Sequence, residues 1–319
     1  MKKILIIPNH PDIQLIHKSM ERLSTSHDDT YFYYKDCAFT LHNNQTFDGV
    51  LVINHPVKKY TVHTNPYNNV CIMQEPGEKI HHHYMYQNLK QYNKVYSPIV
   101  AYNNTEQSHG FLSWFIDGDY TTLSKMDTPI KTQKMSCIAS GKAIFDGHKK
   151  RLQFVQTLEK EINSIAYFGF GNHLKVPSKN DALFPYQYSI AIENNEQPHY
   201  FTEKIMDCFL SYTVPIYFGC TNIAEYFPEQ SYIWININEP QIAIANIKKI
   251  LANDDWQSRL PYLKIARELV LNKYHPLACM YNYMQNANQT ATPNNVSFKP
   301  YKMSIAKEVQ LKLKSILKK

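Results

Sequence analysis

A segment near the middle of the chain combines polar side chains with an element pattern that suits anion binding. The apolar run Tyr188–Ile192 predicts a buried strand, and a polar loop with one proline follows it. Apolar residues then recur at helical spacing from Glu203, with Thr202 as the expected N-cap, before the strand Val214–Phe218. In such a unit the free N–H groups at the helix start face the carboxyl edge of the sheet, where an anion is favoured. Lys204 adds a positive charge, so we expect the phosphates of a nucleotide to bind here.

Strands and helices alternate on both sides of this unit and would position it. In the first half of the chain, strands are expected at 3–8, 47–54, 69–74 and 94–97, and helices at 14–23 and 80–93. In the second half, further strands are expected at 134–139, 165–168 and 232–237, and helices at 149–161, 241–251 and 256–274. The alternation predicts an α/β fold with parallel sheets. A polar, turn-rich stretch at 119–133 places a domain boundary there.

The central segment also carries a family resemblance. Ile192–Asn194, then Tyr200–Lys204, a helix and Val214–Gly219 resemble the signature of the bacterial-type α1,3-fucosyltransferases, glycosyltransferase family 10. A weaker likeness includes Gln74–Pro76 and Ser140–Leu158. The resemblance implies an inverting glycosyltransferase that moves L-fucose from GDP-fucose to a GlcNAc-containing glycan, in the synthesis of a surface polysaccharide or lipopolysaccharide.

The same resemblance implies the GT-B fold, in which two Rossmann-like domains face each other across a cleft. Residues 1–130 would form the acceptor-binding domain, and residues 131–275 the domain that binds the GDP-sugar. Residues 276–319 would form a C-terminal extension that ends in a basic amphipathic helix.

Five residues correspond to donor-binding positions of the family: Arg151, Asn194, Tyr200, Glu203 and Lys204. Arg151 and Lys204 match cations that contact the donor phosphates, and a guanidinium can bind two phosphate oxygens at once. Asn194 and Glu203 match residues suited to ribose or sugar hydroxyls, and Tyr200 matches an aromatic residue beside the donor. Without the resemblance, Arg151 would be interpreted as a surface charge and Glu203 as an acid that favours a helix N-terminus.

Two more glutamates follow predicted strands. Glu193 either contacts the donor or has a structural role, bonding the amides of its loop. Glu75 follows the strand 69–74 and should face the cleft, where it matches the general base that deprotonates the acceptor hydroxyl. The wording around Glu75 departs from the commonest family form, and Glu78 is close enough to compete. We take Glu75 as the expected catalytic residue.

Two patterns in the chain resemble metal-binding sequences, and neither predicts a metal site. His81, His82 and His83 are adjacent, so on a helix they point in different directions and cannot share one ion as i and i+4 histidines can. Asp117-Gly118-Asp119 is typical of a turn. We therefore expect no bound metal and no cofactor, with GDP-fucose as the donor substrate and a glycan as the acceptor.

Composition favours a folded protein of the cytoplasm. The chain has 319 residues, 44% of them hydrophobic, which suffices for two domain cores. No apolar run approaches the roughly 20 residues that span a membrane, and no signal peptide is apparent. The six cysteines are scattered without a Cys-x-x-Cys pair, which is typical of buried thiols in a reducing compartment.

The net charge of +7 is concentrated at the C-terminus, where residues 299–319 contain seven lysines and one glutamate. Apolar residues there share one helical stripe, so residues 300–319 either lie on an anionic membrane as a peripheral helix or pack on the protein itself. No nucleic-acid motif appears, and we expect no nucleic-acid partner. Two alternatives stay open: a different nucleotide-sugar donor with the same fold, and a non-catalytic basic protein that binds membrane or nucleic acid.

Overall fold

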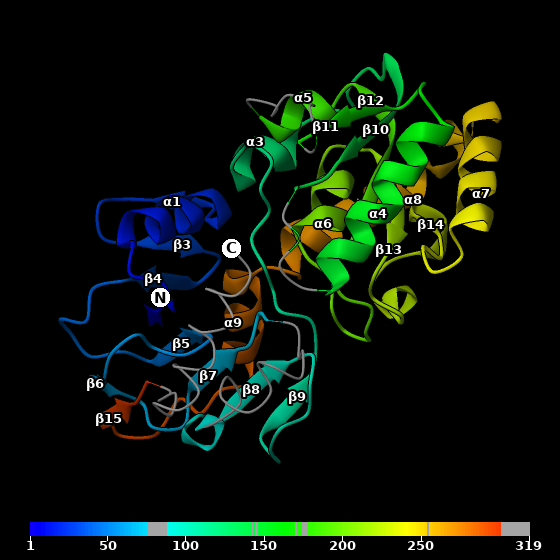
Figure 1. The fold of residues 1–319 in the computed structure, drawn as a ribbon. Helices are drawn as coiled ribbons and strands as arrows, with labels where there is room; N and C mark the ends of the chain where they lie inside the picture. The colour runs from blue at the N-terminus through cyan, green and yellow to red at the C-terminus, as the bar shows by residue number, and fades with distance from the viewer. Residues whose placement is uncertain are drawn as a thin grey trace.

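The computed structural model describes residues 1–75, 88–141, 143, 146–169, 171, 173, 178–253 and 255–300. Within this part the chain forms two α/β domains, each built on a mainly parallel sheet (Figure 1). The predicted α/β architecture is therefore confirmed. The predicted residues 80–87 of the second helix and the tail 301–319 lie outside the described residues.

The first domain contains one large sheet with the order β2-β3-β4-β1-β5-β7-β8-β9. Its pairs from β4 to β9 are parallel, whereas β2, β3 and β4 pair antiparallel. The elements are β1 (Lys2–Ile7), α1 (Ile13–Leu23), β2 (Ser26–His27), β3 (Phe32–Tyr34), β4 (Cys37–Thr40), β5 (Gly49–Ile53), β7 (Asn69–Ile72), η1 (Leu89–Gln91), β8 (Lys94–Ser97) and β9 (Thr105–Gln107). Strands β5 and β7 are buried at every position, as expected of parallel strands with both faces covered.

The second domain has a sheet in which all neighbouring pairs are parallel, in the order β11-β10-β12-β13-β14. Its elements are β10 (Gln133–Ile138), α4 (Asp146–Glu161), β11 (Ala166–Phe168), α5 (Lys179–Leu183), β12 (Tyr186–Ile192), α6 (Glu203–Leu210), β13 (Val214–Phe218), η2 (Ile223–Glu225), η3 (Glu229–Ser231), β14 (Ile233–Trp234), α7 (Pro240–Ala252) and α8 (Trp256–Asn272). The order reverses between β10 and β12, because β11 lies on one side of β10 and β12 on the other. That reversal is a topological switch point, where open α/β sheets bind ligands.

The region around the predicted domain boundary contains a short helix, α3 (Tyr120–Lys125). Asp119 caps it, since its side chain accepts a hydrogen bond from the Thr122 N–H at 2.7 Å. The sequence analysis did not predict this helix, because the stretch is polar and lacks a clear apolar period. Trp114, which precedes it, is fully buried, and its indole N–H donates to the carbonyl of Gly118 at 3.1 Å.

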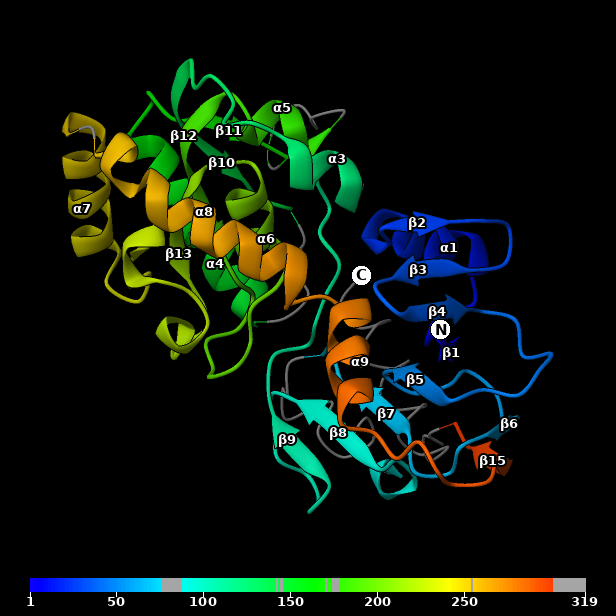
Figure 2. The same ribbon diagram turned by 180° about the vertical axis from the view of Figure 1, so that it is seen from behind.

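After α8 the chain returns to the first domain. Helix α9 (Pro276–Gln285) lies beside β7 and β8 in both views (Figures 1 and 2), and β15 (Asn294–Phe298) pairs antiparallel with β6 (Tyr60–Thr64). The predicted single helix 256–274 is therefore too long at its end, and α9 was not predicted. Extended backbone at His275 separates the helices, because the residue before a proline disfavours helical geometry.

The described residues form no helix long and apolar enough to cross a membrane. All six cysteines are buried free thiols, as predicted.

Candidate functional site

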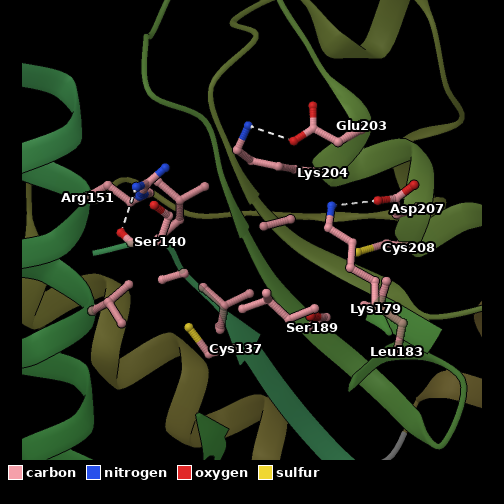
Figure 3. A pocket seen from close by; sticks show the side chains of 16 residues that line it. Cys137, Ser140, Arg151, Lys179, Leu183, Ser189, Glu203, Lys204, Asp207 and Cys208 are labelled. Atoms are coloured by element: carbon pink, nitrogen blue, oxygen red, sulfur yellow. Dashed lines mark hydrogen bonds and ion pairs between the residues drawn. The ribbon is translucent and has the colours of Figure 1, made fainter. Parts of the chain in front are cut away.

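A cavity of about 150 Å³ opens at the switch point of the second sheet. Its walls come from the carboxyl ends of β10 and β12 and from helices α4, α5 and α6 (Figure 3). Ligand pockets commonly measure 300–1,000 Å³, so this cavity fits part of a nucleotide sugar rather than the whole molecule. Arg151, Glu203 and Lys204, three of the predicted donor-binding residues, line it.

Arg151 lies on the inward face of α4, and only 5% of it is exposed. Its guanidinium donates to the Ser140 carbonyl at 3.0 Å and to the Asn194 side-chain oxygen. Its Nε–H is buried and has no hydrogen-bond partner among the described residues. Burial lowers the pKa of Arg151, while the charges of Glu193 and Glu203 oppose that effect. The alternative of a surface charge is therefore wrong, and one N–H remains available to an acceptor.

The neighbouring backbone is shaped around this contact. Gly147 lies in the first turn of α4, and a Cβ there would collide with the carbonyl oxygen of Asn194. Only glycine permits so close an approach. Gly147 thus lets the loop after β12 come close to the helix that carries Arg151.

Lys204 is the centre of a charged cluster at the start of α6. Its ammonium donates to Glu193 at 3.0 Å, to the Thr202 hydroxyl at 2.9 Å and to Glu203 at 3.3 Å. Thr202 is the N-cap, as predicted, and its side chain accepts from the Lys204 N–H. Burial alone would lower the pKa of Lys204, but the two carboxylates prevail and raise it. Lys204 is therefore a fixed positive charge at the edge of the cavity.

The two glutamates of this cluster differ in exposure. The Glu193 side chain is fully buried and accepts from both the N–H and the hydroxyl of Thr202, at 2.7 and 2.9 Å. Glu193 therefore accepts a hydrogen bond from a loop amide, as expected if its role is structural. It does not line the cavity. Glu203 is 15% exposed, and although burial opposes it, the charges of Lys204 and Lys179 lower its pKa.

Lys179 and Asp207 also line the cavity, and the sequence analysis missed both. Asp207 is 1% exposed and accepts from Lys179 at 2.7 Å and from the backbone N–H groups of Phe115 and Ile116 at 2.8 and 3.3 Å. One signal was available, because Asp207 is an acid flanked in the helix by the apolar residues Ile205, Met206 and 208–210. Figure 3 shows the Lys179–Asp207 and Lys204–Glu203 pairs on one side of the cavity and Arg151 on the other.

Tyr200 and Glu75 do not line this cavity. Tyr200 is 6% exposed in the loop before α6. Glu75 is exposed just after β7, at the carboxyl edge of the first sheet. Its neighbour Gln74 is held by Asn54, whose side-chain oxygen accepts the Gln74 N–H at 2.8 Å. The roles of both residues remain predictions.

Asp117-Gly118-Asp119 leads into α3: the chain bends at Asp117, which accepts from the Ser178 hydroxyl, and Asp119 caps the helix. Across the described ranges, no group of three or more His, Cys, Asp or Glu side chains is arranged to hold a metal ion. The histidines at 81–83 lie outside these ranges.

Comparisons with known proteins agree with this geometry. Residues 129–273, which include the whole second sheet, match the family model of glycosyltransferase family 10 (fucosyltransferase), C-terminal part. The chain is 38% identical over 58 residues to an α-(1,3)-fucosyltransferase of Helicobacter pylori, which is 18% of this chain and 12% of that protein. It is 37% identical over 83 residues to GDP-fucose protein O-fucosyltransferase 3 of Danio rerio, covering 26% and 17% of the two chains. The aligned segments thus span only a small part of these curated relatives.

Solved structures extend the likeness to both domains. An α1,3-fucosyltransferase structure matches with a TM-score of 0.50 and 17% identity, covering 86% of this chain and 91% of that one. The E. coli trehalose-6-phosphate protein bound with UDP-2-fluoro glucose matches with a TM-score of 0.51 and 7% identity, covering 92% and 100%. At such identities the matches establish the fold alone, and they confirm the predicted GT-B arrangement. The part of the chain that matches the family model of glycosyltransferase family 10 (fucosyltransferase), residues 129–273, is also the part that contains the switch-point cavity.

Proposed function

We propose that this protein transfers L-fucose from GDP-fucose to a hydroxyl of a GlcNAc-containing glycan, with inversion at the anomeric carbon. The observation that carries the proposal is the switch-point cavity, which Arg151 of α4 lines on one side and Lys204, at the start of α6, lines on the other (Figure 3). The match of residues 129–273 to the fucosyltransferase family model and the names of the relatives support fucose as the sugar and GDP as its carrier. Assembly of a surface polysaccharide or lipopolysaccharide is the setting we propose for this activity.

The cavity supplies what a departing nucleoside diphosphate needs. Arg151, Lys179 and Lys204 line it, and the N–H groups of the first turn of α6 add partial positive charge. The unpartnered Nε–H of Arg151 is a donor for a phosphate oxygen. Preorganised donors of this kind stabilise the charge that develops on the leaving group as the glycosidic bond breaks. In our proposal Glu203 and Asn194 bind hydroxyls of the donor.

Glu75 is our proposed general base. It is exposed at the carboxyl edge of the first sheet, so an acceptor hydroxyl can approach it from solvent. In an inverting transfer the base takes the hydroxyl proton while the oxygen attacks the anomeric carbon from the side opposite the diphosphate. An exposed carboxylate in one domain and a cationic cavity in the other are consistent with that geometry.

Calorimetric titration tests the donor assignment. The chain is titrated with GDP, GDP-fucose, GDP-mannose, UDP-galactose and UDP-GlcNAc, with and without a divalent metal. We expect the tightest sugar-nucleotide binding with GDP-fucose, and no requirement for the metal. A preference for another nucleotide sugar would replace the donor, and failure to bind any nucleotide would overturn the enzymatic proposal.

Residues 300–319 support a proposal about location, because their lysines and apolar stripe suit the cytoplasmic face of an anionic membrane. Sedimentation with vesicles of anionic and of neutral lipid, using the full chain and a chain ending at residue 299, tests it. We expect binding only to anionic vesicles and only by the full chain. Equal sedimentation of the two chains would contradict a membrane role for the tail.

A further inference from the structure

A second hollow, of about 310 Å³, lies between the two domains and apart from the switch-point cavity. The first domain lines it with residues of β8 and β9 and the following loop, and the second domain with His199, η2 and the end of α8. Two contacts place it beside the proposed chemistry. Gln74, next to Glu75, donates to the Phe111 carbonyl at 3.4 Å. The His109 ring stacks on Phe201, close to the start of α6, with centroids 4.4 Å apart.

His109 brings an unused hydrogen-bond donor to this hollow. It is 1% exposed, and its Nδ1 accepts from the Phe111 N–H at 3.1 Å, so the ring proton resides on Nε2. Burial lowers the pKa of His109 well below its ordinary value, which keeps the ring neutral. Nε2 has no hydrogen-bond partner among the described residues. A buried polar atom without a partner is rare and calls for a ligand or water as its missing acceptor.

The backbone around the hollow is also unusual. Phe111 and His199 both have left-handed conformations, with φ of 45° and 59°. Bulky side chains adopt this region rarely, and such residues cluster at ligand-binding sites. One comes from each domain, and both line the same hollow.

A neighbouring hollow of about 490 Å³ adjoins this one, since Tyr96 and Asn282 line both. Along α9 the lining residues Cys279, Asn282, Tyr283 and Asn286 recur at helical spacing on one face. From Cys279 to Asn286 this face is about 10 Å long, which exceeds one pyranose ring. We name these two adjoining hollows together the α9 groove, because residues of α9 and β8 line both. Figure 2 shows these two elements beside each other.

The lining of the α9 groove suits a neutral, hydroxyl-rich ligand. Its charges balance. Lys94 pairs with Glu106 at 2.5 Å, and Lys273 and Glu225 add one charge of each sign to the lining. An anionic or cationic polymer would find no excess of opposite charge here.

Side chains that can bind sugars are present along the groove. The side-chain amides of Asn282 and Asn286 make no hydrogen bond within the described part of the chain, and each offers both donors and an acceptor. The half-buried ring of Tyr96 lies between the two hollows and offers an aromatic surface to the C–H groups of a sugar.

We propose that the α9 groove binds the acceptor as an oligosaccharide, with the reacting sugar in the interdomain hollow beside His109 and the next sugars along Asn282 and Asn286. This inference rests on the proposed transferase function. It adds that the enzyme binds longer oligosaccharide acceptors more tightly than shorter ones. A single sugar would occupy only the interdomain hollow.

Calorimetry or saturation-transfer NMR on the full chain, with GDP present, tests the groove independently of turnover. The probes are GlcNAc, the disaccharide N-acetyllactosamine and the tetrasaccharide of two N-acetyllactosamine units. We expect the tetrasaccharide to bind at least about tenfold more tightly than GlcNAc. In the double variant Asn282→Ala, Asn286→Ala this gain should disappear, with GlcNAc and GDP binding unchanged.

The matched control is Asn246→Ala, an exposed asparagine on α7 far from the groove, which should change nothing. His109→Phe keeps the ring and removes the donor, and it should weaken all three saccharides about tenfold, as loss of one buried hydrogen bond does. Equal affinity for the three probes, a uniform loss in the double variant, or no binding of any saccharide would overturn the inference. Failure to bind GDP-fucose would instead remove the transferase function on which it rests.

Discussion

The charged side chains at the carboxyl edges of the two sheets differ in burial. In the second domain, the buried carboxylates Glu193 and Asp207 pair with the partly buried Lys204 and Lys179, so these charges are held in place before any ligand arrives. In the first domain, Glu75 stands exposed at the end of β7. The difference suits the two halves of a glycosyl transfer, because a diphosphate needs preorganised positive charge whereas a base needs access to its substrate.

The largest expected effect concerns the exposed edge. Glu75→Gln should lower the rate of fucose transfer about 10²- to 10⁴-fold, as loss of a general base does, and leave the Kd for GDP-fucose within about twofold. Initial rates with saturating donor, together with calorimetry, measure both. Glu78→Gln is the companion variant. If it abolishes transfer while Glu75→Gln does not, Glu78 is the base.

Among the charged residues of the second domain, Asp207 should give the largest loss of stability when it is replaced. Asp207→Ala leaves Lys179 and the N–H groups of Phe115 and Ile116 without their acceptor, and removing one partner of a buried pair costs about 3–5 kcal/mol. Urea unfolding should show this loss in the free energy of unfolding. Lys248→Ala breaks the exposed pair with Glu161 and should cost less than about 1 kcal/mol. Similar values for the two variants would contradict the contrast between buried and exposed charge.

Arg151 tests whether the preorganised charge serves the donor. Charge-assisted hydrogen bonds contribute about 1.5–3 kcal/mol, so Arg151→Ala should raise the Kd for GDP about 10- to 100-fold. Arg259→Ala, which removes a cation from the surface of α8, should leave that Kd unchanged. If GDP binds Arg151→Ala as it binds the wild type, the cavity does not hold the diphosphate.

Glu203 gives the smallest effect and a sign that can be checked. Its pKa is lowered in the folded protein, so its contribution to stability is complete above the ordinary value of 4.5 and is lost as the pH falls through the folded value. Between about pH 5 and about pH 3, the wild type should lose more free energy of unfolding than Glu203→Gln. Parallel pH profiles would show that Lys204 and Lys179 do not stabilise the Glu203 carboxylate.

The sequence predicted the second domain better than the first. Apolar runs such as Val214–Phe218 and the capped helix at Thr202 are local signals, and both are present where expected. The short antiparallel strands β2 to β4 were missed, because strands of two to four residues leave little periodicity to detect. The pair β6–β15 joins residues more than two hundred positions apart, which no local pattern reveals.

For the site, the resemblance supplied residues that spacing alone would not. Arg151 lies among lysines, and only the fold shows that it turns inward beside Val155 and Leu158. Lys179 was missed because its importance comes from Asp207, a contact made in space rather than in sequence. Burial and pairing are properties of the folded chain, so the sequence identified candidate charges without saying which of them are fixed.

The position of helix α9 in the sequence determines when the first domain can be completed during synthesis. Its residues Leu277, Met280 and Met284 are fully buried, and a Cβ on Gly49 of β5 would collide with Met280. The second domain is continuous in sequence, whereas the first is completed by a segment that follows it. A ribosome therefore synthesises the whole second domain before α9, so the first sheet lacks the cover that α9 provides until the second domain has been made.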